Sequence, residues 1–219
     1  SQILMDHNQV KGDVAPGFES VKALFARQMR WLAEEHAQLC VYYRGERVVD
    51  LWASAGGNQN FSGDSLVNIF SSGKSLEAIA IGSLVSRGLI DYDARLTQYW
   101  PEFGAQGKEG VTVADLMRHE AGLANFDTSL DAEDLFTENI KKNAVGQVIE
   151  QHGLSYKPGG KREYHAFTRG WIVNELFRRV DPAGRTIGEF LRQEISGPLG
   201  ADVFVGVQEP ERQRMFPVK

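Results

Sequence analysis

The sequence contains a single cysteine, and this scarcity excludes two kinds of stabilising chemistry. Cys40 has no second thiol with which to pair, so no internal disulfide can form and no thiolate cluster can hold a metal. It stands in the apolar run 39–43, where we expect a small buried hydrophobic side chain. His7, His36 and His152 have no partners at a spacing typical of metal ligands. We therefore expect no metal site.

Long apolar runs and clusters of basic residues are absent as well. The longest apolar helical stretch is interrupted by Glu77, Gly82 and Arg87, which excludes a membrane-spanning helix, and neither end carries a signal-peptide pattern. The formal net charge is -5 and no dense run of Lys and Arg occurs, so nucleic acid is not an expected partner. These absences predict a cytoplasmic protein, with an organelle matrix as the alternative.

The composition that is present predicts an ordinary globular chain. Its 219 residues are 42% hydrophobic and 24% charged, enough to bury the core of one domain or of two small lobes. Residues 1–17 predict an irregular lead-in, and apolar residues that recur every three or four positions predict a helix over about 18–36. Two β-rich runs, 39–43 and 47–52, flank Arg44-Gly45-Glu46 and predict a hairpin.

The rest of the chain is predominantly helical by the same periodicity. A polar loop at 56–64 leads to an apolar approach at 67–70, which we expect to be buried. The helix that follows is expected to end at Gly88. Thr112 and Thr186 are expected to cap two later helices, because each stands just before an apolar periodic run.

Ser71 and Lys74 form an S-x-x-K pattern where the strand-like approach meets this first helix. If Ser71 opens the helix, Lys74 lies one turn further along the same face, because residues three apart are neighbours in an α-helix. A serine hydroxyl needs an adjacent base to act as a nucleophile, and a lysine whose pKa is lowered can be that base. Two fixed positions also occur together by chance, so the pattern alone does not establish catalysis.

Two neighbouring patterns favour other roles. Gly73-Lys74-Ser75 has the form of the end of a phosphate-binding loop, but Asn68 stands where the first glycine of that loop belongs, so nucleotide binding is not indicated. His119 lies near the end of the helix expected after Thr112 and is a candidate base. A lone histidine near a helix end more commonly has a structural role, which we expect for His119.

Several blocks of the sequence, taken in order, match one superfamily. The chain resembles the serine β-lactamase and penicillin-binding-protein superfamily, in particular the class C-like branch that includes the family VIII carboxylesterases and the β-lactamase-domain proteins of eukaryotes. Ordered blocks of this kind are far more specific than S-x-x-K alone. The matching blocks are 67–74, 88–93, 99–103, 111–123, Pro158-Gly159 with Tyr164-His165-Ala166, and 197–200.

The resemblance implies a role for three residues. Ser71 would be the acylated nucleophile, and Lys74 the neighbour that accepts or relays its proton. Tyr164 would be the third partner, whose oxygen moves a proton to and from the attacking or leaving group. A nearby Lys74 ammonium would be the means of lowering the pKa of this tyrosine. The alternative for Tyr164 is a packing residue at the start of a helix.

Two departures from the family pattern change the expected substrate and the expected extent of the chain. Ala166 stands where β-lactamases of this branch carry an asparagine that helps to hold the substrate, which favours an ester or a less polar acyl group. Relatives also continue into further strands and a K-T-G, H-x-G or W-x-G motif, whereas this chain stops at Lys219. The missing strand normally supplies one of two oxyanion donors, worth about two to three orders of magnitude in rate.

The fold that the resemblance implies is α+β and β-lactamase/transpeptidase-like. We expect an antiparallel sheet represented here only by its N-terminal hairpin, with flanking helices and an all-helical region. Residues 1–66 would form the helix and hairpin, and residues 67–219 the helical region with both motifs. Because the hairpin would be left with an unpaired edge, we expect the chain to be a fragment, completed by a separate C-terminal chain or by a homo-oligomer.

The first functional hypothesis is a serine hydrolase that acts on small esters, or on amides or β-lactams, through an acyl-enzyme on Ser71. Such chemistry needs no metal and no organic cofactor. The second hypothesis is a non-catalytic binding or scaffold protein of the same fold. Retention of Ser71, Lys74 and Tyr164 together favours the first, and the absent third motif favours the second.

Overall fold

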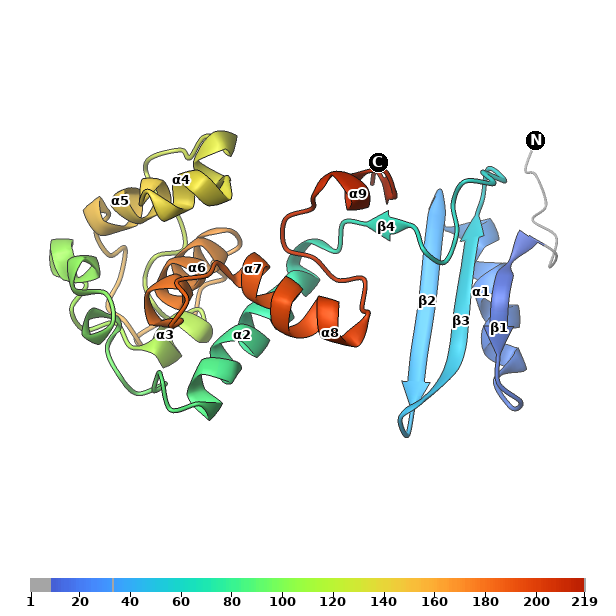
Figure 1. Cartoon of the computed structure of the whole chain (residues 1–219), viewed down its shortest axis with the longest axis horizontal. Coiled ribbons are helices and arrows are strands. Elements are labelled where there is room, and N and C mark those ends of the chain that lie inside the picture. Colours follow the sequence, from blue (N-terminus) through green and yellow to red (C-terminus); the bar gives the residue numbers. More distant parts are fainter. Residues whose placement is uncertain (1–8, 33, 219) are drawn as a thin grey trace. The chain divides into compact units, whose positions relative to one another are not determined.

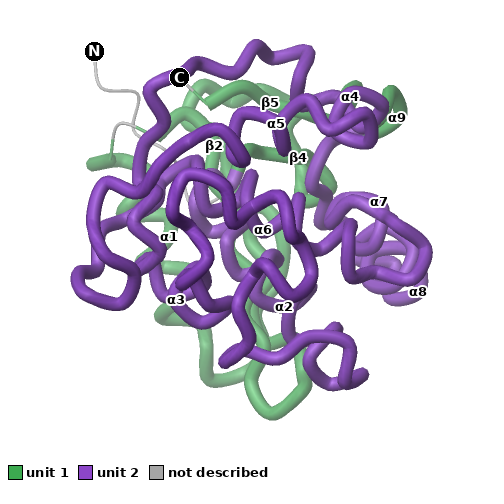
Figure 2. Tube along the Cα trace, turned by 90° about the vertical axis from the view of Figure 1, so that its left-hand side faces the viewer, with its two compact units in different colours: residues 1–68, 208–219 green, residues 69–207 purple. Residues whose placement is uncertain are grey.

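A computed structural model describes residues 9–32 and 34–218 of the protein. The chain divides into two compact units, shown in different colours in Figure 2. Unit 1 comprises residues 1–68 and 208–219, and unit 2 comprises residues 69–207. Helices and an antiparallel sheet occur together, which confirms the predicted α+β class.

Unit 1 is built on a three-stranded antiparallel sheet in the order β1-β3-β2 (Figure 1). The predicted hairpin is confirmed as β2 (His36–Tyr43) and β3 (Glu46–Ser54). Its turn residues Arg44 and Gly45 both have positive φ, 52° and 83°, the conformation that matches the twist of a two-residue hairpin turn.

The irregular lead-in predicted for residues 1–17 is wrong in part. Residues 11–14 form β1 (Lys11–Val14), which pairs with β3 so that Gly12 faces Leu51; residues 1–8 lie outside the described part of the chain. The sheet therefore has one strand more than the expected hairpin, and β3 is paired along both edges. A four-residue strand that contains a glycine and two charges carries almost no alternating apolar signal, which explains the omission.

Helix α1 (Glu19–Trp31) packs on this sheet and ends five residues before the predicted position. Its buried residues Phe25, Ala26 and Met29 share a core with residues of β3. The chain becomes extended at Leu32, and His36 already pairs with Ser54 in the sheet. Strand pairing thus overrides the helical periodicity after Trp31.

The prediction that Cys40 is buried is also wrong, since its side chain is exposed. Alternate residues of a strand point to opposite faces, and Leu39 takes the side that packs against the core. Cys40 therefore takes the opposite side of the strand, which is exposed.

The last twelve residues belong to unit 1 and not to the helical region that was predicted for 67–219. The two-residue strand β4 (Leu66–Val67) pairs in parallel with β5 (Met215–Phe216), and α9 (Glu209–Arg212) precedes β5. Phe216 also packs edge-on against His36 and Phe61, with ring centroids 5.1 and 5.2 Å away. Pairings between such short and distant segments leave no periodic signal in the sequence.

Unit 2 is helical, and its core lies between α2 (Lys74–Ser86), α6 (Thr168–Val180) and the turns around Trp100. The two capping threonines are confirmed, since Thr112 and Thr186 each form a capping box. The remaining helical segments are η2 (Phe70–Gly73), η3 (Leu96–Gln98), η4 (Pro101–Gly107), α3 (Val113–Met117), η5 (Ala132–Leu135), α4 (Thr137–Lys141), α5 (Ala144–Gln151), α7 (Ile187–Leu191), the π-helical η6 (Arg192–Ser196) and α8 (Gly197–Leu199).

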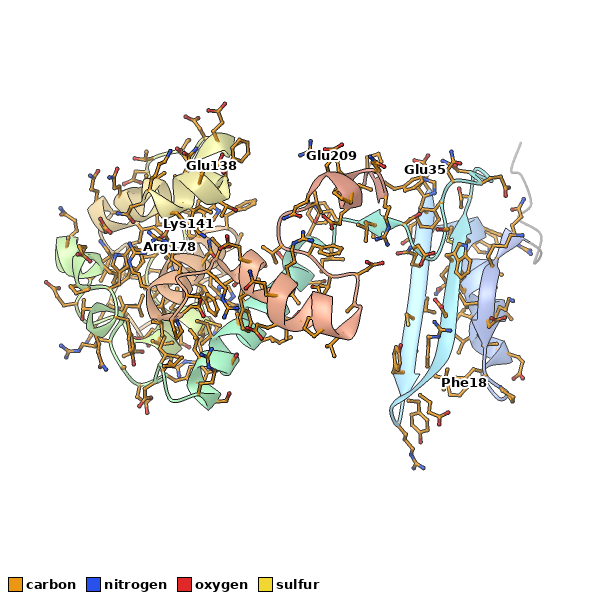
Figure 3. The ribbon with its side chains drawn as sticks, in the orientation of Figure 1. Phe18, Glu35, Glu138, Lys141, Arg178 and Glu209 are labelled. Carbon is orange, nitrogen blue, oxygen red and sulfur yellow. The ribbon has the colours of Figure 1, made fainter. Side chains whose placement is uncertain are left out.

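Unit 2 also buries charged groups, each against fixed partners. Lys108 is fully buried, and its ammonium donates to the carbonyls of Ala105 at 2.7 Å, Glu150 at 3.0 Å and His152. Burial lowers the pKa of Lys108 to about 8. Arg178, labelled in Figure 3, donates to the buried Glu175 at 2.6 Å.

Within residues 9–32 and 34–218, no helix combines the length and the apolar character that crossing a bilayer requires.

Candidate active site

Ser71 lies in the 3-10 turn η2, and α2 begins three residues later at Lys74. The preceding residue, Phe70, has φ of 46°, a left-handed conformation that costs an ordinary side chain about 1–2 kcal/mol. The approach expected to be buried is instead exposed, at 37% for Val67 and 67% for Phe70. A sharp, strained turn therefore presents the Ser71 hydroxyl at the surface of unit 2.

The structure brings Ser71, Lys74 and Tyr164 together. Tyr164 donates from its hydroxyl to Ser71 Oγ at 2.7 Å, and Lys74 donates from Nζ to the same oxygen at 3.3 Å. Lys74 Nζ also lies 4.9 Å from the centre of the Tyr164 ring, within the range of a cation–π contact. One oxygen is thus shared by an amine from the next helical turn and by a phenol 93 residues away.

A backbone carbonyl fixes the lysine. Lys74 Nζ donates to the carbonyl oxygen of Ala166 at 2.6 Å, its shortest hydrogen bond in the site. A backbone oxygen can perform this role with any side chain at the position, so an alanine at 166 is compatible with an anchored lysine. The sequence carried no signal for this contact, because every residue has a carbonyl.

The electrostatics of the site favour the phenolate of Tyr164. Hydrogen bonds, first with Ser71 and then with Lys74, lower the pKa of this phenol, and the charges of Lys74 and Arg169 add to the effect. A lower pKa increases the fraction of Tyr164 that can accept a proton near neutral pH. Tyr164 is 53% exposed, so the residue lies at the surface of unit 2.

His119 packs against Tyr164, and its ring nitrogens lie next to His165 and Arg169. The rings of His119 and Tyr164 lie 4.9 Å apart, and His119 Nδ1 accepts a hydrogen bond from the amide of His165 at 3.0 Å. Burial, followed by the nearby charge of Arg169, lowers the pKa of His119 to about 4. At neutral pH the ring is therefore uncharged, and the expected structural role for His119 stays a prediction.

His165 anchors the segment that carries Tyr164. This buried imidazole accepts from the amide of Leu123 at 3.1 Å through Nε2, so its proton is on Nδ1, which donates to the carbonyl of Glu163 at 2.6 Å. Thr168 adds a hydrogen bond to the carbonyl of Leu123 at 2.6 Å. The loop before Leu123 and the start of α6 are held as one piece, which fixes the direction of Tyr164.

Within the described part of the chain, no group of three or more His, Cys, Asp or Glu side chains is arranged to hold a metal ion.

Comparison with known proteins identifies the family of the chain. The beta-lactamase family matches residues 21–215. The chain is 36% identical over 197 residues to Esterase/beta-lactamase LipL of Mycobacterium tuberculosis (strain ATCC 25618 / H37Rv), covering 89% of this chain and 44% of that protein. It therefore spans about half the length of the curated relative that it matches.

Solved structures agree. A family VIII carboxylesterase superposes with a TM-score of 0.85 at 33% identity, over 94% of this chain and 56% of that one. A penicillin-binding protein homolog from Caulobacter crescentus has a TM-score of 0.84 at 32% identity, over 94% of this chain and 55% of that one. EstA from Arthrobacter nitroguajacolicus Rue61a has a TM-score of 0.80 at 33% identity, over 92% of this chain and 52% of that one. Because the family match takes in most of the sequence, the chain belongs to the beta-lactamase family.

Proposed function

We propose that the protein is a serine hydrolase that cleaves small esters through an acyl-enzyme on Ser71. The observation that carries the proposal is the position of Ser71 Oγ, 2.7 Å from the Tyr164 hydroxyl and 3.3 Å from Lys74 Nζ. A nucleophile with two proton-transfer groups within hydrogen-bonding distance is the arrangement that activates a serine. Similarity to an esterase/beta-lactamase and to a family VIII carboxylesterase supports the same reaction class.

The reaction proceeds in two acyl transfers. The Ser71 proton passes to the Tyr164–Lys74 pair as Oγ bonds to the carbonyl carbon of the ester. The tetrahedral intermediate collapses, the bond to the alkoxy oxygen breaks, and the departing alcohol takes a proton from the same pair. Water then attacks the acyl group on Ser71, giving up its proton to the pair, and Ser71 regains a proton as the carboxylic acid leaves.

The surroundings of the nucleophile favour an apolar acyl group. Ala166 offers no side-chain amide to a polar substituent. The next residue, Phe167, is 73% exposed and stacks on Trp171, with the two ring centroids 6.2 Å apart. An aromatic surface next to the Lys74 anchor favours contact with hydrocarbon over contact with a polar acylamino group. Esters are therefore the proposed substrates, ahead of amides and β-lactams.

The test compares hydrolysis of p-nitrophenyl acetate and butyrate by the protein that contains this chain and by two serine variants. Ser71→Ala should reduce kcat to background, a loss of about 10³-fold or more, because the acylated oxygen is gone. Ser72→Ala is the matched control, since Ser72 is the adjacent exposed serine, and it should retain activity. Equal rates for wild type and Ser71→Ala would refute the proposal and favour a binding protein.

A further inference from the structure

Three further side chains, Arg169, Glu77 and His119, form a connected cluster beside the residues proposed for catalysis. We propose that Arg169 is a positioning residue that joins the helix bearing Lys74 to the segment bearing Tyr164, with Glu77 as its counter-ion. This inference rests on the proposed function, because it assigns a role in the reaction of Ser71. It adds residues that neither the S-x-x-K pattern nor the tyrosine motif contains.

Arg169 contacts two separate parts of the site from its place in α6. Its Nη2 donates to the backbone carbonyl of Lys74 at 3.3 Å, and its Nη1 lies 3.2 Å from His119 Nε2. Arg169 is only 7% exposed, and a guanidinium is rarely buried to that extent unless an opposite charge lies beside it. The planar group therefore sets the distance between the first turn of α2 and the loop at His119.

Glu77 supplies the negative charge that such burial requires. Its carboxylate Oε2 lies 3.2 Å from Arg169 Nε, and both side chains are largely buried. Burial raises the pKa of Glu77, while the charges of Arg169 and Lys74 oppose that rise. Since Glu77 stands one helical turn after Lys74, the carboxylate reaches Arg169 from the same helix that carries the lysine.

Gly170 of α6 lies beside the Glu77 carboxylate. A Cβ atom added to Gly170 would lie 2.9 Å from Glu77 Oε1, closer than side-chain carbons normally approach an oxygen. Glycine at position 170 thus lets Glu77 lie against the helix next to Arg169.

His119 links Arg169 to Tyr164. Its Nδ1 accepts from the His165 amide, its Nε2 faces the Arg169 guanidinium, and its ring lies 4.9 Å from the Tyr164 ring. A neutral imidazole accepts through one nitrogen only, so acceptance at Nδ1 places its proton on Nε2, which then contacts Arg169 without accepting from it, whereas an imidazolium could accept from neither donor and is disfavoured. A neutral ring of fixed orientation then holds the phenol toward Ser71.

Arg169 also acts on Tyr164 through its charge. The positive charges that lower the pKa of Tyr164 are those of Lys74 and Arg169, and Arg162 is a further cation near His119. Glu77 is the carboxylate that lies 3.2 Å from Arg169, so its negative charge opposes that of the guanidinium. Removal of Arg169 or of Glu77 should therefore shift the titration of Tyr164 in opposite directions.

The test follows the phenol by ¹³C NMR of tyrosine-labelled protein, with Tyr164→Phe to assign the signal. In Arg169→Met the Tyr164 titration should move to higher pH, in Glu77→Gln it should move to lower pH, and in Arg169→Lys it should stay near wild type. In ester turnover, Arg169→Met should lose about 10- to 100-fold in kcat with little change in KM, since misplacement of a catalytic group by about 1 Å costs about 10²-fold.

The outcomes separate this inference from the proposed function. The NMR titration needs no turnover, so an inactive wild-type protein would refute the hydrolase while the titration still decides the role of Arg169. If Arg169→Met fails to fold, Glu77→Gln decides, because it retains the shape of the side chain and removes only the charge. An unchanged Tyr164 titration in every folded charge-removing variant would overturn the inference.

Discussion

The two units of the chain are stabilised by different kinds of interaction. Unit 1 combines strand pairing with a small apolar core, and the buried polar residues of its described part are the uncharged Ser54 and Ser65. Unit 2 has the larger apolar core, and the buried charged side chains of the described chain, such as Lys108, Arg169 and Glu175, lie there. Ser71, Lys74 and Tyr164, the residues proposed for catalysis, all lie in unit 2.

Buried polar groups are a costly way to stabilise a fold, but they fix geometry. Apolar packing tolerates small shifts, whereas a hydrogen bond weakens steeply with misalignment. Unit 2 holds the loops at both sides of Tyr164 through the buried His165 on one side and the half-buried His119 on the other.

The largest change in the free energy of unfolding is expected when a buried charge of unit 2 is removed. Lys108→Met leaves three carbonyls without their donor, two of them at the C-terminal end of α5, and should lower the free energy of unfolding by about 2–4 kcal/mol. Lys141→Met is the control, because Lys141 forms a partly exposed ion pair with Glu189 at 2.8 Å worth about 0.5 kcal/mol. Urea unfolding measures both, and equal losses would contradict the role given to burial.

An intermediate loss of stability is expected when the pH is lowered. The pKa of His119 is about 4 in the folded protein and its ordinary value is 6.5, so between these values the unfolded chain binds a proton that the folded chain does not. The His119 contribution is fully present above pH 6.5 and is lost as pH falls toward 4. Urea unfolding at several pH values should show this loss in wild type and a weaker one in His119→Gln. Parallel curves for the two proteins would show that His119 titrates normally.

The smallest changes in the free energy of unfolding are expected from substitutions at two glycines, and these changes have opposite signs in the two units. Gly45→Ala puts a side chain at φ of 83° in the hairpin turn of unit 1 and should cost about 1 kcal/mol. Gly82→Ala adds a Cβ in the middle of α2, where nothing lies within 4 Å, and should stabilise unit 2 by about 0.5–1 kcal/mol. Hydrogen exchange read separately for each unit distinguishes the two, and a loss at Gly82 would reveal an unexpected constraint on α2.

Local signals in the sequence were sufficient for many parts of the fold. The hairpin around Gly45 and the caps at Thr112 and Thr186 depend on residues within a few positions of one another, and each was predicted. The grouping of Ser71, Lys74 and Tyr164 came from the family resemblance, since no spacing rule joins residues 71 and 164.

Features that depend on distant partners could not be predicted. Strands β1 and β5 are too short to show alternation, and the end of α1 at Trp31 is set by pairing of the following residues with β3. The contact of Arg169 with His119 joins side chains fifty residues apart, and the anchor of Lys74 is a backbone carbonyl. Such contacts exist only once the helices have packed.

The most direct test of the central claim is to map where a fluorophosphonate probe reacts with the protein that contains this chain. The account predicts a covalent adduct on Ser71, located by peptide mass spectrometry, that forms much more slowly in Tyr164→Phe and at the normal rate in the control Tyr92→Phe. A protein that hydrolyses esters without an adduct on Ser71, or that labels Ser71 equally fast without the Tyr164 hydroxyl, would contradict it.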